Sequence, residues 1–403
     1  MADIVAMAEP IKFKKLAIVG ASVRAAAFSA LRAGFEVVAA DLFADADLRA
    51  HCDATRIEAG YPDALADWLA ATECDGWLFT GALENHHELI NAMAKLRPLV
   101  GCSGGAIRAT RNPLLLQPVI QAAGLAFPET VETGDKLPLD RSWLCKTYRS
   151  ANGSGVWLLD GVEARERANE EGAYFQRFVG GTSAAAVYLC SRSGSTLLGV
   201  THQLVGDAVA GAKPWHYAGS VGPLRISDAV AAQLAKLGEL LSERFKLAGL
   251  VGVDLVIAGD KAWIIEINPR YSASAEVVER MIGVSVIGAH VKACAGEAVE
   301  LPPSLRSGRG AAKSDEGAVN THGKLILYAK RDAVVDEAFH AWAMSQSSLD
   351  PQACRLADIP AVGETISAGH PILTAFASTA AANYDGEMKR RIAQVTMKLY
   401  GEE

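Results

Sequence analysis

The sequence lacks the features of an exported, membrane-spanning or nucleic-acid-binding protein. No stretch approaches the ~18 apolar residues of a membrane helix, and the first dozen residues lack the basic start and apolar run of a signal peptide. Lysine and arginine number 39 against 46 aspartates and glutamates, so the net charge of −7 gives no general attraction to nucleic acid or anionic lipid. We therefore expect a small-molecule partner, and neither nucleic acid nor membrane.

The cysteines lack the spacing of a redox or zinc site. None forms a C-x-x-C pair, and a chain of this size with scattered cysteines usually keeps them as reduced, structural thiols. This pattern predicts a cytoplasmic protein. The seven residues are Cys52, Cys74, Cys102, Cys145, Cys190, Cys294 and Cys354.

The first 110 residues alternate strand-like and helix-like stretches. Apolar strands are expected at residues 16–20, 36–40, 77–80 and 99–101, and an Ala-rich helix ends near Ala33. Such βαβ order predicts a doubly wound, Rossmann-like α/β domain over residues 1–110.

The pattern changes to α+β from Trp143 onwards. Strands joined by Gly-rich turns recur, and an amphipathic helix is expected at residues 229–245. Residues 302–317 collect Pro, Gly, Ser and Lys, which is typical of a linker or mobile loop. We therefore expect a second domain at 111–301, with a mobile lid subdomain at about 141–182, and a C-terminal module at 318–403.

The strongest chemical pattern is a hairpin with polar residues at one end. Two strands joined by the turn at residues 259–260 would hold Asp254 near Glu266 and Asn268, and the last two face the same side of the sheet. Oxygen ligands on a rigid hairpin suit Mg²⁺, which adds phosphate oxygens and water. Arg270, two residues further, would neutralise a transferring phosphoryl group. The alternative is a surface hairpin, but polar ends on an apolar strand cost burial energy unless something binds them.

Two further segments become informative only together with this hairpin. Lys146 lies in an apolar strand before the loop of Gly153, Ser154 and Gly155, so it could meet an anion under backbone N–H groups. A glycine-rich hairpin with a snorkelling lysine explains the same residues. The segment Gln176 to Val179, which includes Phe178, ends in a glycine pair. It could bind an adenine ring by its backbone, or be an ordinary strand and turn.

These three segments, in this order, resemble the ATP-grasp superfamily. The resemblance implies that Lys146 binds the phosphates of ATP, that the 151–156 loop closes over them, and that Gln176, Phe178 and Val179 contact adenine. It also implies that Asp254, Glu266 and Asn268 hold Mg²⁺ (or Mn²⁺) and that Arg270 steadies the γ-phosphate or acyl phosphate.

Most of the chain takes part in the resemblance. Residues 81–85, 197–203 and 217–223 look like the predicted carboligases related to biotin carboxylase, and the C-terminal module is similar to the biotin carboxylase tail. Relatives such as tyramine–glutamate ligase imply a carboxylate–amine ligase, one option being one-carbon cofactor synthesis. A homodimer is compatible with this resemblance.

Some residues depart from the family pattern or allow two interpretations. The additional phosphate-binding lysine of the superfamily is missing, and Arg111 is the only obvious substitute. Gln203 lies between the nucleotide motifs and is a site candidate. The segment Gly20 to Arg24 lacks the later glycines of a dinucleotide fingerprint, so Arg24 is either scaffold or a site for a substrate anion. Residues 84–87 indicate a capped helix start rather than a metal cluster.

The expected reaction is activation of a carboxylate as an acyl phosphate, followed by attack of an amine. Biotin carboxylase has a glutamate base four residues beyond its arginine, where this chain has Ser274, and Glu276 could substitute only through a bulge. This favours organic carboxylate and amine substrates. The alternatives are a carboxylase that uses bicarbonate and a non-catalytic ATP-binding regulatory protein.

Overall fold

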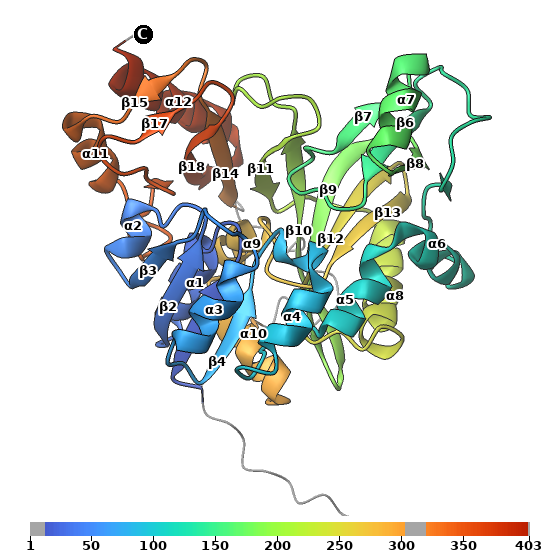
Figure 1. Cartoon of the computed structure of the whole chain (residues 1–403), viewed down its shortest axis with the longest axis horizontal. Helices are drawn as coiled ribbons and strands as arrows, with labels where there is room; N and C mark the ends of the chain where they lie inside the picture. Colours follow the sequence, from blue (N-terminus) through green and yellow to red (C-terminus); the bar gives the residue numbers. More distant parts are fainter. Residues whose placement is uncertain (1–12, 303–319, 402–403) are drawn as a thin grey trace, which may run out of the picture.

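The N-terminal domain is built on a parallel sheet of order β3-β2-β1-β4. The computed structural model describes residues 13–302 and 320–401 (Figure 1). The doubly wound prediction is confirmed, although the expected strand at 99–101 is an isolated bridge from Leu99 to Trp77. The strands are β1 (Lys15–Val19), β2 (Glu36–Asp41), β3 (Asp53–Arg56) and β4 (Gly76–Phe79), and the helical elements are α1 (Arg24–Arg32), α2 (Ala46–Arg49), α3 (Ala64–Ala71), η1 (Leu83–Asn85) and α4 (His87–Met93).

A small α/β unit follows, which we call the lid. It is an antiparallel sheet of order β5-β8-β6-β7, covered by one helix whose buried side, together with Trp143 and Phe175, forms a separate core. Because the lid has a core of its own, it forms a separate structural unit. It lies at the upper right of Figure 1. Its elements are β5 (Thr130–Val131), β6 (Trp143–Thr147), β7 (Val156–Leu158), α7 (Val162–Glu170) and β8 (Ala173–Arg177), and α5 (Gly104–Arg111) and α6 (Pro113–Ala122) lead into it.

The centre of the molecule is an eight-stranded antiparallel sheet of order β13-β12-β9-β10-β11-β14-β18-β16. Because β14 pairs with β11, the C-terminal strands extend the same sheet instead of forming a separate one. Its first five strands and their helices are β9 (Thr182–Ser191), β10 (Gly194–Val205), β11 (Tyr217–Gly222), β12 (Gly249–Ala258), β13 (Lys261–Asn268), α8 (Asp228–Glu243), α9 (Ala275–Ile282) and α10 (Val286–Ala295).

The C-terminal module lies opposite the lid in Figure 1 and packs α12 on β18. The linker expected at 302–317 lies outside the described residues, apart from Pro302. Within the described residues, the structure has no helix of a length and apolarity suited to crossing a membrane. The elements are β14 (Asn320–Tyr328), β15 (Ala333–Val334), α11 (Glu337–Met344), β16 (Leu356–Ala357), β17 (Thr365–Ile366), β18 (Pro371–Ala380), η4 (Ala381–Asn383) and α12 (Tyr384–Tyr400).

A buried arginine joins these parts. Arg24 of α1 is 2% exposed, and its guanidinium donates to Glu276 of α9 and to both carboxylate oxygens of Asp358, at 2.9 and 3.0 Å. Lys324 of β14 donates to Glu276 at 3.1 Å. Burial disfavours the charged form of Glu276, but Arg24 and Lys324 outweigh it and hold its pKa far below the usual range. Arg24 is therefore occupied by the protein's own carboxylates, which supports the scaffold interpretation.

We predict that Arg24→Met strongly destabilises the fold. It leaves the buried carboxylate of Glu276 and the partly buried carboxylate of Asp358 without their main counter-ion, and breaking a buried pair typically costs about 3–5 kcal/mol. Urea unfolding followed by circular dichroism measures the shift. Arg192→Met, at an exposed turn, is the matched control and should change stability by less than about 0.5 kcal/mol. Equal unfolding midpoints for the two variants would refute the bridging role.

Candidate active site

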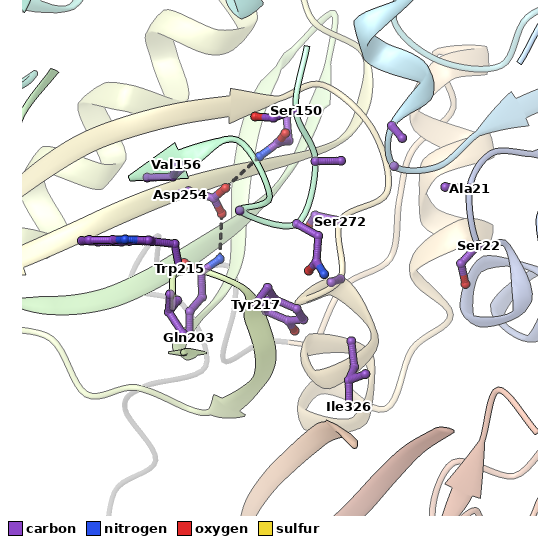
Figure 2. Close-up of a pocket in the computed structure, with 18 of the residues that line it drawn as sticks. Ala21, Ser22, Ser150, Val156, Gln203, Trp215, Tyr217, Asp254, Ser272 and Ile326 are labelled. Carbon is purple, nitrogen blue, oxygen red and sulfur yellow. Dashed lines mark hydrogen bonds between the residues drawn. The ribbon is translucent and has the colours of Figure 1, made fainter. Parts of the chain in front are cut away.

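One large cavity lies where the N-terminal domain, the lid, the central strands and the C-terminal module meet. Its volume is about 1270 Å³. Figure 2 shows Ser22 of the N-terminal domain, Trp215 before β11 and Ile326 of β14 around this space. Of the thirteen residues assigned to the ATP and metal sites from the sequence, eleven line the cavity, whereas Ser154 and Gly155 do not. The eleven are Arg111, Lys146, Gly153, Gln176, Phe178, Val179, Gln203, Asp254, Glu266, Asn268 and Arg270.

The predicted hairpin is formed by β12 and β13. Asp254 lies opposite Glu266 in the ladder, and a bulge follows directly after Asp254. The carboxylate of Asp254 accepts from Gln203 at 2.8 Å and from the Asn268 amide at 3.0 Å, and Figure 2 shows Gln203 pointing at it. Burial raises the pKa of Asp254, although these hydrogen bonds oppose the shift. A cation at this position would restore the favourable environment of a carboxylate.

Two arginines approach the other side of Asn268. Its amide oxygen accepts from Arg111 at 3.2 Å and from Arg270 at 3.1 Å. Arg270 does not continue strand β13, which ends at Asn268, but its guanidinium still reaches the hairpin. It also donates to Glu84 at 2.5 Å. Burial alone would raise the pKa of Glu84, but the positive charges of Arg270 and Arg111 outweigh the effect of burial. The pKa of Glu84 is therefore lowered.

Arg111, the expected substitute for an additional phosphate-binding lysine, lines the cavity. It pairs with Glu266 and donates to Asn85 at 2.9 Å. The Nε atoms of Arg111 and Arg270 and one oxygen of Glu84 are buried without a hydrogen-bond partner among the described residues. Orphaned polar atoms are rare in folded proteins. Together with the cavity they indicate a polar ligand beside the hairpin.

The hairpin residues fit a magnesium ion by their chemistry. Asp254, Glu266 and Asn268 supply two carboxylates and one amide, the hard oxygen ligands that Mg²⁺ prefers. Within the described residues, no group of three or more His, Cys, Asp and Glu side chains is placed to hold a metal ion. In the structure the Asn268 oxygen faces the arginines and its nitrogen faces Asp254. Ligation by Asn268 beside Asp254 therefore requires its amide to turn.

Lys146 enters the cavity from β6 of the lid. Its ammonium donates to Gln176 at 2.6 Å, and Gln176 in turn donates to Thr130 at 3.2 Å. The Gln176 side chain is thus occupied with positioning the lysine. Burial lowers the pKa of Lys146 to about 8, while Asp254 acts in the opposite direction. A desolvated lysine is suited to meeting an anion.

The segment after Gln176 forms an aromatic edge of the cavity. Phe178 is 44% exposed and meets Trp215 edge to face, with ring centroids 6.0 Å apart. Apolar side chains continue this wall on both the lid and the central sheet, which suits a flat, apolar ring. They are Leu144, Val156, Val179, Leu255 and Ile265.

The glycine-rich loop packs too closely to its neighbours for larger residues. Gly153 has φ of +77°, and a Cβ there would lie 1.9 Å from the Trp215 carbonyl oxygen. At Gly155 a Cβ would lie 2.0 Å from the Thr147 hydroxyl. Ser154 turns back to donate to Ala151 at 2.9 Å. Gly155 therefore permits the tight turn, while Gly153 brings the loop to the cavity.

Hydrogen bonds hold this loop from two sides. On the C-terminal side, the Tyr328 hydroxyl of β14 accepts from Asn152 at 3.2 Å and donates to the Tyr217 carbonyl at 2.8 Å. On the N-terminal side, Asn85 donates to the Ser150 carbonyl at 3.2 Å while its oxygen accepts from Arg111. Asn85 thus joins the loop to Arg111.

Sequence reasoning missed several of these residues. It treated Glu84 and Asn85 as part of a capped helix start, but the helix begins without a side-chain cap and Glu84 is a buried partner of Arg270. A carboxylate just after an apolar strand and a glycine turn was the available signal. Tyr328 carried no signal. Four non-glycine residues with positive φ line the cavity, as backbone strain at functional sites would predict: Ala82, Asn152, Trp215 and Asp358.

The central part of the chain matches a known protein family. Residues 110–274 match the family model described as an ATP-grasp domain. No curated protein sequence matches the chain.

Several solved structures share its fold at low identity. The biotin carboxylase of Campylobacter jejuni has a TM-score of 0.65 at 13% identity, covering 92% of this chain and 89% of its own. The N5-carboxyaminoimidazole synthetase of Staphylococcus aureus has 0.66 at 13%, covering 95% and 99%. The L-amino acid ligase of Bacillus licheniformis has 0.67 at 15%, covering 94% and 97%.

We predict that Tyr328→Phe loosens the loop at residues 150–156. The change removes only the hydroxyl that bridges Asn152 and Tyr217, and each such hydrogen bond contributes about 0.5–1.5 kcal/mol. Hydrogen exchange of these amides should therefore accelerate severalfold in the ligand-free protein. Tyr400→Phe, which removes a hydroxyl that accepts from the Lys330 N–H at 3.3 Å, is the control. Identical loop protection in both variants would rule out the bridge.

Proposed function

We propose that this chain, a member of the ATP-grasp superfamily, is an ATP- and Mg²⁺-dependent carboxylate–amine ligase that works through an acyl phosphate. The observation that carries the proposal is the hairpin with Asp254, Glu266 and Asn268 facing Arg111, Arg270 and Lys146 around one cavity. Oxygen ligands beside several cations are the arrangement that phosphoryl transfer requires.

In this proposal the nucleotide lies between the lid and the central sheet. Phe178, Val179 and the apolar wall receive the adenine, while Gln176 positions Lys146 toward the phosphates. The loop at 151–156 covers the phosphates. Asp254, Glu266 and Asn268 would hold the metal ion, Mg²⁺ or Mn²⁺, which supplies charge neutralisation on the phosphate oxygens. Gln203 orients Asp254.

The arginines act on the transferring group. Arg270, held by Glu84, and Arg111, held by Asn85, present guanidinium groups to the γ-phosphate. A carboxylate oxygen of the substrate attacks this phosphorus, and the bond to ADP breaks. The amine then attacks the acyl carbon, phosphate leaves and the amine loses its proton. Positioning and charge compensation provide most of the rate in such steps.

The residues beyond Arg270 favour an organic acid over bicarbonate. Ser274 stands where biotin carboxylase has its glutamate base, and it is buried and hydrogen-bonded to Ser220 at 3.0 Å. Glu276 is fixed as a carboxylate between Arg24 and Lys324, so it is a poor base. The cavity of about 1270 Å³ also exceeds the roughly 300–1,000 Å³ typical of a single drug-sized ligand.

A bicarbonate-dependent carboxylase is the second candidate. Biotin carboxylase and N5-carboxyaminoimidazole synthetase are among the solved structures with this fold, as is L-amino acid ligase. A non-catalytic ATP-binding regulatory protein is less favoured, because it would not need the full charged set. A cytoplasmic location, a homodimer, and a role in one-carbon cofactor synthesis belong to the same proposal.

We predict that hydroxylamine traps the activated acid as a hydroxamate. ADP release is screened over amino acids and other carboxylates with Mg-ATP, first with hydroxylamine and then with candidate amines, and products are identified by mass spectrometry. Glu266→Gln removes a metal-directed charge and should reduce turnover by orders of magnitude with the fold intact. ATP turnover that depends on bicarbonate, with its label in the product, would favour the carboxylase instead.

A second prediction concerns pH. With the Lys146 pKa lowered to about 8 by burial, the free protein carries the ammonium below this pH and the neutral amine above it. ATP affinity should therefore weaken as pH rises through this pKa. Lys146→Arg keeps its charge throughout, so its affinity should stay nearly constant over about one unit on either side. Calorimetry that finds the same pH dependence in both proteins would exclude Lys146 as the titrating group.

A further inference from the structure

The C-terminal module contains a second cavity, of about 570 Å³. Strand β16 pairs only with Thr374 and Ala375 of β18, so the rest of β18 extends beyond it at the edge of the sheet. The cavity lies at this edge, between the end of β18, the segment before β16, η4 and the first turns of α12. It shares no lining residue with the large cavity.

Arginines dominate the lining of this cavity. Arg390 and Arg391 of α12 share the carboxylate of Glu387, and Arg355 comes from the segment before β16. Three guanidinium groups thus face one carboxylate. In a chain with a net charge of −7, this excess of two positive charges is a distinct local feature.

Arg391 shows that the excess charge is partly built into the fold. It is 7% exposed, and its Nε atom has no hydrogen-bond partner among the described residues. Burial lowers its pKa, Glu387 opposes this, and Arg355 and Arg390 lower it further. Like charges held together in a half-buried pocket repel one another, and an anion placed between them would remove that cost.

Other residues with donor groups line the same space. Asn383 and Gly386 line the cavity at the N-terminal end of α12, a helix of 17 residues that begins without a side-chain cap. The first N–H groups of a helix lack intrahelical partners and favour anions. Thr379 of β18 adds a hydroxyl at the opposite wall.

We propose that this cavity, which we call the arginine pocket, binds a small dianion through a phosphate or carboxylate group, outside the catalytic cavity. Planar guanidinium groups form bidentate contacts with phosphate and with carboxylate groups. The net charge of the lining matches two negative charges. The ligand is thus a small phosphorylated or dicarboxylic metabolite, and the pocket is not a second nucleotide site.

The floor of the arginine pocket connects to the catalytic cavity. Phe376 lines the pocket, and the Arg280 guanidinium lies 3.8 Å from its ring centroid. Arg24 lies 5.9 Å from the same ring and binds Glu276 and Asp358. An anion in the pocket would therefore contact the side chain against which the central arginine network packs, which makes the ligand suited to an effector role.

The test is calorimetric titration of the full chain with inorganic phosphate, inorganic pyrophosphate and malonate. The double variant Arg355→Ser/Arg390→Ser should weaken binding at least tenfold, because it removes two of the three guanidinium groups. Both side chains are exposed, so the fold should stay intact. Arg192→Ser/Arg244→Ser removes two other exposed arginines and should bind as the wild type does. Stronger binding of pyrophosphate than of malonate assigns a phosphorylated ligand, and the reverse order assigns a dicarboxylate.

A further variant separates the two cavities. Lys146→Ala removes a phosphate-directed cation of the catalytic cavity only. The binding component that is lost in the Arg355/Arg390 variant should therefore persist in Lys146→Ala. Binding that is lost in Lys146→Ala but kept in the Arg355/Arg390 variant would place the anion in the catalytic cavity and overturn the proposal. Absence of binding to the wild type would overturn it too. So would a change of oligomeric state in the double variant with unaltered anion binding, since the arginines would then serve a contact between copies.

Discussion

The charge of Arg24 has to be compensated inside the protein, and much of the structure follows from that requirement. A buried guanidinium is stable only when carboxylates surround it with good geometry. Glu276 comes from α9 and Asp358 from the C-terminal module, so compensation draws both to the N-terminal domain. Lys324 then balances the second carboxylate oxygen of Glu276. The walls of the large cavity are positioned by this network.

The same principle explains the hairpin of β12 and β13. Asp254, Glu266 and Glu84 are close to Arg111, Arg270 and Lys146, so the site is nearly neutral before any ligand enters. The two arginines nevertheless keep unused donor capacity, as their orphaned Nε atoms show. A site of this kind can accept a metal ion and phosphates by rearranging existing pairs, without first creating large uncompensated charges.

The lid and the C-terminal module meet through the loop over the cavity. Gly153 allows the close approach to Trp215, and Asn152 then reaches Tyr328. Because Asn85 links the same loop to Arg111, the position of the loop and the orientation of the Arg111 guanidinium are coupled. The C-terminal strands are thus part of the site as well as an extension of the sheet.

The sequence by itself determined the local features of this protein. The apolar strand and helix patterns predicted the doubly wound domain and the helix at α8, because these depend on short-range periodicity. The polar pattern of Asp254, Glu266 and Asn268 predicted the hairpin, because a two-residue spacing fixes the face of a strand. Lys146 and the glycine loop became interpretable only beside that hairpin.

Only the tertiary structure decided which distant residues complete the site. From the sequence, Glu84 was part of a helix start, and Arg24 was either scaffold or a site for a substrate anion. In the structure Glu84 is a buried ion-pair partner of Arg270. Arg24 is paired with the carboxylates of Glu276 and Asp358. Tyr328 and the arginine pocket depend on strands and helices that meet far along the chain. Such contacts have no sequence period, because folding and not spacing along the chain brings their partners together.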